Sequence, residues 1–301
     1  MGDMDQEVDA ELRTSHLIET EDLAKRIASG DSTLRIVDMR GAVKTTQIAE
    51  GVQTADYCGS RSEYDLGHIP GAIYLDWTRD IVDLTDSVAA QAAPADKVKS
   101  VFEAAGIGDH NLIVAYDAHP ASQFATRLWW LMKYYGNKNV RVLNGGWKKW
   151  IAEQRPVSTE TPTYPAARFT PRRAPEWRVI SKEVAGMIGS PDTAIVDARD
   201  PDQYTGRIRR GSRGGHIPGA LNIPRELLFS EDGTYKPPAE LAHTFVEHGI
   251  PVDKHVVAYC NGGVAATSVL FALSMLGYRR LSNYDGSWNE WAELEEMPVE
   301  G

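Results

Sequence analysis

The chain contains four short apolar runs, each of which is rich in β-branched residues and bounded by turn-forming residues. Runs of this length and composition are typical of strands that are buried on both faces. They occupy residues 34–39 (LRIVDM), 112–116 (LIVAY), 193–198 (TAIVDA) and 255–259 (HVVAY). The pattern therefore predicts two pairs of strands, one pair in each half of the chain.

Two longer apolar segments follow the second strand of each pair and have the length of helices. Residues 122–136 and 266–277 end in Gly136 and Gly277, where a glycine at the C′ position would terminate a helix. Apolar strands that alternate with helices indicate parallel sheets covered on both faces. The predicted fold class is therefore α/β with doubly wound parallel sheets, whose ligands bind beyond the carboxyl ends of the strands.

Four sequence blocks occur twice, in the same order. The pairs are IVDMR (36–40) and IVDAR (195–199), GHIPGA (67–72 and 215–220), IVAYD (113–117) and VVAYC (256–260), and NGGWKKW (144–150) and DGSWNEW (285–291). A repeat of this kind means two copies of one domain. Between them lies a Pro- and Thr-rich stretch without apolar periodicity, which reads as a surface linker. We predict a first domain at 1–155, a linker at 156–175 and a second domain at 176–301.

Composition narrows the class of protein. The chain has 301 residues, which is enough for two domains that each bury a core. No segment approaches the ~18 apolar residues of a membrane span, and the N-terminal region lacks the pattern of a secretory signal. We therefore expect a cytoplasmic protein with no membrane partner. The net charge of -10 gives no general attraction to nucleic acid, so we expect no nucleic-acid partner either.

The two cysteines, Cys58 and Cys260, lie far apart and have no neighbouring Cys or His at metal-ligand spacing. This arrangement favours neither a disulfide framework nor a structural metal, and we expect no metal site. At least one thiol should be free.

Cys260 has the sequence surroundings of a nucleophile. It follows a predicted strand and precedes a turn, Asn261, Gly262, Gly263, Val264 and Ala265, which leads into a helix beginning near Ala266. The two glycines allow backbone conformations in which successive N–H groups turn inward as an anion-binding nest, and the helix N-terminus adds partial positive charge. Such a loop would stabilise a thiolate, which is the reactive form of cysteine.

With these blocks in this order, the chain resembles the tandem-domain rhodaneses, the thiosulfate and 3-mercaptopyruvate sulfurtransferases. In that family the second domain carries the nucleophilic cysteine at the head of a six-residue loop, here residues 260–265, and the first domain is a non-catalytic copy. Asp117 stands where the first copy would carry the cysteine. The resemblance implies that the first copy is inactive and forms a wall of the cleft.

The resemblance also implies a reaction and its partners. Cys260 would take a sulfane sulfur from thiosulfate or 3-mercaptopyruvate, hold it as a persulfide and pass it to cyanide, a small thiol or a thioredoxin-like acceptor. No cofactor is needed for this chemistry, and the loop amides would stabilise the anion. We expect a monomer, because the two domains can bury each other's apolar faces.

The donor is less well defined by the resemblance. Members that favour thiosulfate tend to carry basic residues after the cysteine, whereas the loop here, CNGGVA, is neutral and resembles the mercaptopyruvate branch slightly more. The family also places an arginine where this chain has Gln203. A replacement is expected among four arginines that precede the second GHIPGA block, because the guanidinium fork suits a carboxylate or sulfonate. Arg213 is the first choice, and Arg207, Arg209 and Arg210 are the alternatives. The other interpretation of this basic run is a solvated loop.

Asp197 and Arg199 recur in the first copy, so we assign them to structural support rather than to substrate binding.

Two other functions were weighed against the enzyme. A cysteine-dependent phosphatase on the same fold needs an arginine that closes a longer loop, and position 266 is alanine, which argues against it. A protein persulfide carrier with little small-molecule turnover stays open, because the loop lacks cations. The intact mass of the protein shows whether Cys260 carries a sulfur atom, and steady-state assays with both donors separate the carrier from the enzyme.

Overall fold

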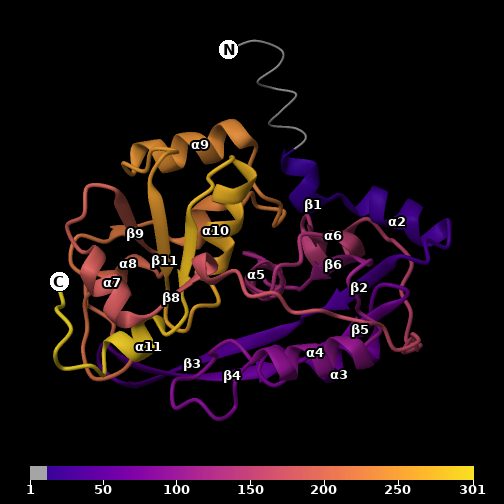
Figure 1. Ribbon diagram of the computed structural model, residues 1–301, viewed down its shortest axis with the longest axis horizontal. Coiled ribbons are helices and arrows are strands. Elements are labelled where there is room, and N and C mark those ends of the chain that lie inside the picture. Colours follow the sequence, from indigo (N-terminus) through magenta and orange to yellow (C-terminus); the bar gives the residue numbers. More distant parts are fainter. Residues whose placement is uncertain (1–11) are drawn as a thin grey trace.

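The computed structural model describes residues 12–301 and contains two α/β domains that lie side by side (Figure 1). The predicted first domain starts at residue 1, and residues 1–11 of it lie outside the described part. Each domain is built on a five-stranded parallel sheet. The predicted α/β class and the predicted duplication are therefore confirmed.

The two sheets have the same topology. The first has the order β1-β7-β6-β2-β5 and the second the order β8-β12-β11-β9-β10, so corresponding strands occupy corresponding places. The first sheet comprises β1 (Leu17–Ile18), β2 (Leu34–Asp38), β5 (Ala72–Tyr74), β6 (Leu112–Tyr116) and β7 (Val140–Leu143). The second comprises β8 (Arg178–Val179), β9 (Thr193–Asp197), β10 (Leu221–Asn222), β11 (His255–Tyr259) and β12 (Leu281–Tyr284). All four strands predicted from the sequence are present, and they form the centres of the two sheets.

Helices cover both faces of each sheet (Figure 1). The first domain contains α2 (Thr20–Ala28), α3 (Arg61–Leu66), α4 (Ala95–Ala104), α5 (Gln123–Tyr134) and α6 (Gly146–Ala152). The second contains η1 (Pro175–Trp177), α7 (Ser181–Met187), α8 (Pro201–Tyr204), η2 (Arg225–Leu228), α9 (Pro238–Glu247), α10 (Ala266–Met275) and α11 (Ser287–Trp291). Gly136 and Gly277 follow the C-caps of α5 and α10 with φ of 78° and 83°, as the C′ prediction requires.

Alternate residues of each central strand enter different cores. Val256 and Ala258 of β11 face a large cluster that spans both domains, whereas Val257 and Tyr259 face a separate cluster beneath α7 and α11. The large cluster includes the buried residues of α5 and α10, which pack against each other across the domain boundary. The two domains therefore share one core, and that core holds the end of β11 close to the first domain.

A β-hairpin that the sequence analysis did not predict reaches from the first domain to the second. Strands β3 (Gly41–Ala49) and β4 (Val52–Gly59) pair antiparallel, and Figure 1 shows them passing beneath the second domain. Near the turn of the hairpin, Gly51 O accepts from Arg209 N at 2.8 Å, and Gln53 N donates to Arg209 O at 2.9 Å. These backbone bonds attach the hairpin to the loop that precedes the second GHIPGA block.

The proposed linker, residues 156–175, runs along the first domain between α6 and η1. Apart from Pro175, which begins η1, it forms no helix or strand beyond an isolated bridge between Ser158 and His68. Arg172 N and Ala174 N donate to carbonyls of Tyr135 and Tyr134 at the end of α5. The linker is therefore attached to the first domain at several points.

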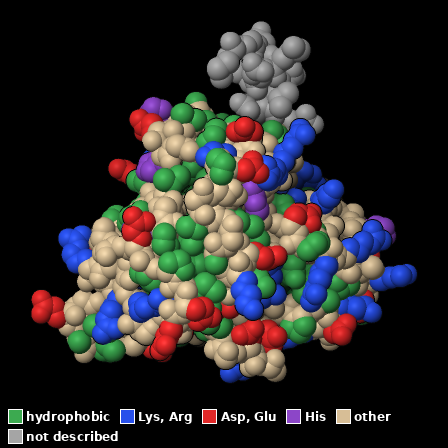
Figure 2. All heavy atoms as spheres, turned by 60° about the vertical axis from the view of Figure 1, so that its left-hand side comes forward, with side chains coloured by type: hydrophobic (Ala, Val, Ile, Leu, Met, Phe, Trp, Pro, Cys, Tyr) green, Lys and Arg blue, Asp and Glu red, His purple; other side chains and the backbone are tan. Residues whose placement is uncertain are grey.

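The surface carries charges of both signs. Figure 2 shows Lys and Arg side chains interspersed with Asp and Glu over the visible face. Within residues 12–301, no helix combines the length and the apolar character needed to cross a bilayer.

Candidate active site

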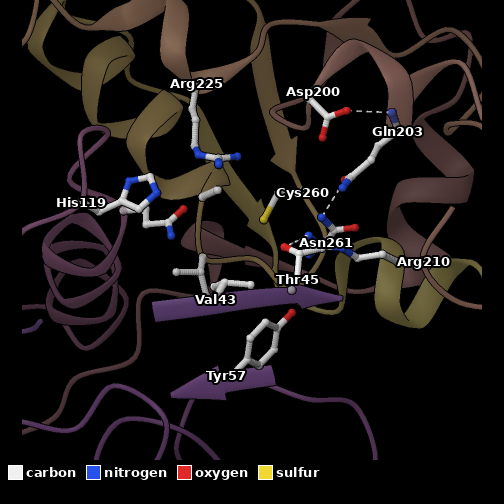
Figure 3. A pocket seen from close by; sticks show the side chains of 14 residues that line it. Val43, Thr45, Tyr57, His119, Asp200, Gln203, Arg210, Arg225, Cys260 and Asn261 are labelled. Atoms are coloured by element: carbon white, nitrogen blue, oxygen red, sulfur yellow. Dashed lines mark hydrogen bonds between the residues drawn. The ribbon is translucent and has the colours of Figure 1, made fainter. Parts of the chain in front are cut away.

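Cys260 lies directly after β11, at the carboxyl end of the second sheet, where ligands of such sheets bind. Its N–H donates to Ser287 Oγ at 3.2 Å and its carbonyl accepts from Trp288 N at 3.0 Å. The residue is 3% exposed, and it lines a cavity of about 150 Å³ together with its loop, Asn261, Gly262, Val264 and Ala265. Figure 3 shows the sulfur directed into this cavity.

The carbonyl groups of the loop point away from the cavity. Cys260 O accepts from Trp288 N, and Asn261 O accepts from Asn289 N at 2.8 Å. Gly263 O accepts from Asn283 Nδ2 at 2.9 Å and from Arg127 Nη1 at 3.1 Å. None of these donors lines the cavity. A trans peptide directs its N–H opposite to its carbonyl, so the amides that follow these carbonyls turn toward the cavity side.

These amides are free to bind an anion. Among the hydrogen bonds of residues 12–301, none has the N–H of residues 261–266 as its donor. Helix α10 begins at Ala266, so its positive end also faces the loop. The combination of unpaired amides and a helix N-terminus is the arrangement that stabilises anions in proteins.

Only one of the two loop glycines needs the special conformation. Gly263 has φ of 68°, and a Cβ there would lie 2.7 Å from Asp285 O. Gly262 has no such φ, and a Cβ there would first meet the side-chain ends of Tyr57 and Asn289. Gly263 is therefore the position at which the loop depends on glycine.

In the first domain the side chain of Asp117 occupies the hydrogen-bonding amides of the corresponding loop. Asp117 Oδ1 accepts from His119 N at 2.8 Å, and Asp117 Oδ2 accepts from Phe124 N and Ala125 N, each at 2.8 Å. Asp117 is fully buried, and burial raises its pKa to about 7 although the three amides favour the anion. The first loop therefore has a carboxylate where the second loop has a thiol.

The first domain also walls the cavity of the second, as predicted. The hairpin, the loop before α5 and the first residue of α5 contribute five of the lining residues: Val43, Thr45, Tyr57, His119 and Gln123. Burial raises the pKa of Tyr57, whose hydroxyl accepts from Asn289 Nδ2 at 3.1 Å. Tyr57 is therefore a neutral phenol next to the thiol (Figure 3).

Two arginines line the cavity. Arg210 donates from Nη2 to Thr45 Oγ1 at 3.1 Å, and burial lowers its pKa. Arg225, from the start of η2, approaches Cys260 from a different side (Figure 3). The Nε atoms of both arginines are buried and have no hydrogen-bond partner within the described part of the chain. Because both side chains line the cavity, their guanidinium groups can bind an anionic ligand there.

The first choice for a substrate-binding arginine lies elsewhere. Arg213 does not line the cavity, and its guanidinium donates to the carbonyls of Trp291, Ala292, Leu294 and Met297 at 2.6 to 2.9 Å. These carbonyls lie at and beyond the end of α11, where backbone acceptors lack helical partners. The guanidinium satisfies them, and the expectation that Arg213 faces Cys260 is corrected.

Arg209 also lies outside the cavity lining. Its Nη1 donates to Ser212 O at 3.0 Å, and its backbone binds the hairpin. Of the four arginines named from the sequence, Arg207, Arg209, Arg210 and Arg213, the structure therefore brings only Arg210 to the cavity of Cys260.

Gln203 also lines the cavity, from the segment that follows β9. It belongs to the short helix α8, which Asp200 caps by accepting from Gln203 N at 3.0 Å. Gln203 Oε1 accepts from Asn261 Nδ2 at 2.8 Å, which attaches the cysteine loop to α8. Asn261 Oδ1 is buried without a partner among the described residues, so this side of the cavity also offers an acceptor.

Asp197 and Arg199 form a buried ion pair of 2.6 Å outside the cavity lining. Arg199 Nη2 also donates to Gly215 O at 2.7 Å, which joins the end of β9 to the second GHIPGA block. Asp38 and Arg40 make the same pair in the first domain at 2.7 Å, and Arg40 donates to Gly67 O.

Sequence reasoning missed seven cavity residues, five of them in the first domain. The two in the second domain are Asp200 and Arg225. Arg225 is the last residue of the longer repeat GHIPGALNIPR (215–225), whose first-copy counterpart GHIPGAIYLDW (67–77) ends in a tryptophan, so the repeat gave no signal for a cation there. In residues 12–301, no cluster of three or more His, Cys, Asp or Glu side chains could hold a metal ion.

Comparisons with known proteins agree on one family. The profile described as a rhodanese-like domain matches residues 19–153 and again 181–294. The sulfur carrier protein TtuD of Thermus thermophilus is 37% identical over 249 residues, which cover 78% of this chain and 86% of that protein. A Mycolicibacterium smegmatis protein, provisionally named a thiosulfate sulfurtransferase, is 35% identical and covers 79% of this chain and 88% of its own.

A solved structure agrees in fold. SseA from Escherichia coli, described as a 3-mercaptopyruvate sulfotransferase, superposes with a TM-score of 0.79 at 28% identity. The match covers 90% of this chain and 98% of that one. The similarity therefore extends over both domains.

Proposed function

The chain belongs to the rhodanese-like family, and on this premise we propose that it is a sulfurtransferase that carries sulfur on Cys260. Cys260 attacks the transferable sulfur of an anionic donor, the donor leaves as sulfite or pyruvate, and a persulfide stays on the enzyme. An acceptor then removes the outer sulfur and restores the thiolate.

One observation carries the proposal: the thiol lies in a cavity whose loop amides are unpaired. These amides stabilise the thiolate before the transfer and the anionic persulfide after it. Arg210 adds a cation that can hold the sulfonate of thiosulfate or the carboxylate of 3-mercaptopyruvate.

The cavity supports a small donor. Its volume of about 150 Å³ is below the ~300 to 1,000 Å³ of sites for drug-sized ligands. Thiosulfate and 3-mercaptopyruvate both belong to the size class that fits. The neutral loop and the mixed donor and acceptor groups near Asn261 favour 3-mercaptopyruvate, which carries a keto oxygen besides its carboxylate.

The test is steady-state formation of thiocyanate from cyanide with each donor in turn. Wild type is expected to turn over at least one donor and to gain the mass of one sulfur atom on incubation with it. Cys260→Ser should lose both properties, whereas Cys58→Ser should keep both. Equal turnover by Cys260→Ser would overturn the proposal. Arg210→Gln is expected to raise KM for the donor about tenfold or more, because a hydrogen-bonded charge contact is lost.

A protein persulfide carrier is the second candidate. It is favoured by the similarity to the sulfur carrier TtuD and by the absence of basic side chains in residues 260–265. A carrier would load sulfur on Cys260 but turn over small donors poorly. Rapid loading together with negligible thiocyanate formation would select this candidate over the enzyme.

A further inference from the structure

Arg225 has binding capacity that the protein does not use. Its Nη2 pairs with Glu226 Oε1 at 2.9 Å, on a carboxylate whose side chain is 55% exposed. Its Nε is buried and makes no hydrogen bond to any described residue. Arg225 lines the cavity, and its Nη1 makes no hydrogen bond to any described residue, so this nitrogen stays available for a ligand.

His119 lies on the same side of the cavity and comes from the other domain (Figure 3). Its Nδ1 accepts from Ala121 N at 3.0 Å, which leaves the ring proton on Nε2. Burial first, and then the charge of Arg225, lower its pKa to about 4. His119 is therefore a neutral ring that offers one N–H donor beside a cation.

This pair lies apart from Arg210. Figure 3 shows Arg225 and His119 on one side of the sulfur and Arg210, beside Thr45, on the other. The Arg225 side also borders a second hollow. His119 lines both cavities, and the second, of about 420 Å³, is formed by Pro120, Ala121, Glu226, Phe229, Ser230 and Glu231. The two cavities therefore adjoin at His119.

We propose that Arg225 and His119 form a second anion subsite, which binds the carboxylate of the acceptor, and that the small acceptors of this protein are carboxylate-bearing thiols. This inference rests on the proposed function and specifies its second half-reaction. The acceptor thiolate attacks the outer sulfur of the Cys260 persulfide and forms a new sulfur–sulfur bond. The bond to Cys260 breaks, its electron pair stays on Cys260 as a thiolate, and no oxidant or reductant is consumed.

The test uses three thiols that differ only in the group at the end of a two-carbon chain. They are 3-mercaptopropionate, 2-mercaptoethanol and cysteamine, which end in a carboxylate, a hydroxyl and an ammonium group. Protein loaded with one sulfur is freed of donor and mixed with each thiol, and loss of the sulfur is followed by quenched-flow intact mass. Rate constants are divided by the thiolate fraction of each thiol. Wild type should discharge fastest to 3-mercaptopropionate and slowest to cysteamine.

The ratio of the 3-mercaptopropionate rate to the 2-mercaptoethanol rate is the decisive quantity. Arg225→Gln should lower it about tenfold or more, and Arg225→Lys should lower it less, because it keeps the charge but loses the fork. The control is Arg207→Gln, which removes the same charge from a side chain that is 71% exposed and outside the cavity. Should Arg225→Gln not fold, His119→Leu must lower the ratio instead.

Three results would overturn the inference. The first is an unchanged ratio in Arg225→Gln, the second an equal fall in Arg207→Gln, and the third a fall that occurs only in Arg210→Gln. Failure of the proposed function looks different, because wild type would then never gain the mass of a sulfur atom. If wild type loads sulfur and discharges it equally to all three thiols, the proposed function stands and only the subsite is contradicted.

Discussion

Asp117 and Cys260 occupy the same place in the two domains, and they use it in opposite ways. The carboxylate of Asp117 accepts from three amides of its own loop, whereas no described residue accepts from the amides that follow Cys260. One loop is closed by an internal carboxyl group, and the other is open to an external anion. The exchange of one residue thus separates a loop that its own side chain fills from a loop that can accept a ligand.

The buried carboxyl of Asp117 predicts a pH-dependent stability. Burial raises its pKa to about 7, against about 3.9 in an unfolded chain. Its contribution is complete below the unfolded pKa and is lost as the pH rises through about 7. Between about pH 5 and about pH 8, wild type should lose about 2 to 3 kcal/mol relative to Asp117→Asn. Urea unfolding of both proteins at each pH measures this, and parallel pH profiles would contradict it.

Substitution of the two loop glycines should separate backbone strain from side-chain contact. Gly263→Ala places a Cβ at 2.7 Å from Asp285 O in a left-handed conformation, and should destabilise the protein by about 2 kcal/mol or more. Gly262→Ala meets only side-chain ends that can move, and should cost less than about 1 kcal/mol. Denaturant unfolding and the rate of sulfur loading are the measurements. Equal losses in the two variants would show that left-handed backbone is not required.

A buried ion pair between the domains supports the reactive loop. Arg127 of the first domain contacts Asp285 at 2.6 Å and also donates to Gly263 O. Both side chains are 1% exposed, and Asp285 further contacts Arg178 at 3.1 Å. Arg127→Met leaves Asp285 with one cation and should cost about 3 to 5 kcal/mol.

The double variant Arg127→Met/Asp285→Asn is the control for that prediction. It removes the buried charge of Asp285 together with that of Arg127, so it should be more stable than Arg127→Met alone. Sulfur loading should stay slow in both, because Gly263 O has lost its contact with Arg127. A double variant whose losses are the sum of the single losses would show that the two side chains are not coupled.

The two central strands of each sheet and the start of α10 at Ala266 were predictable because they follow from local patterns and from the repeat. Blocks that occur twice placed the strand ends, the C′ glycines Gly136 and Gly277, and Cys260 with its loop. These features depend on residues close in sequence, so the chain itself displays them.

The remainder of the cavity was not predictable in this way. The hairpin residues Val43, Thr45 and Tyr57 lie in the stretch between the first VDMR and GHIPGA blocks, which is longer than its counterpart in the second copy. No repeated block marks them. The prediction that Arg213 binds the donor was wrong for a related reason. Its nearness to GHIPGA in sequence does not show that its guanidinium binds backbone carbonyls at and beyond the end of α11.

Ser287 supplies the last test, because it holds a left-handed conformation that the first copy gives to a glycine. Its φ is 53°, the same as that of Gly146, the residue at this place in the first domain. Ser287 Oγ accepts from Cys260 N at 3.2 Å and donates to Tyr284 O at 2.7 Å. A side chain in this conformation costs about 1 to 2 kcal/mol, so we infer that the hydroxyl is kept to position Cys260.

Two variants separate the strain of Ser287 from its hydrogen bond. Ser287→Gly relieves the strain and loses the acceptor, so its stability should lie within about 1 kcal/mol of wild type. Ser287→Ala keeps the strain and leaves the buried Cys260 N–H unpaired, which should cost about 1 to 3 kcal/mol. Both should load sulfur more slowly than wild type, because both release the backbone of Cys260. If Ser287→Gly loads sulfur at the wild-type rate, then the hydroxyl stabilises the fold without positioning the thiol.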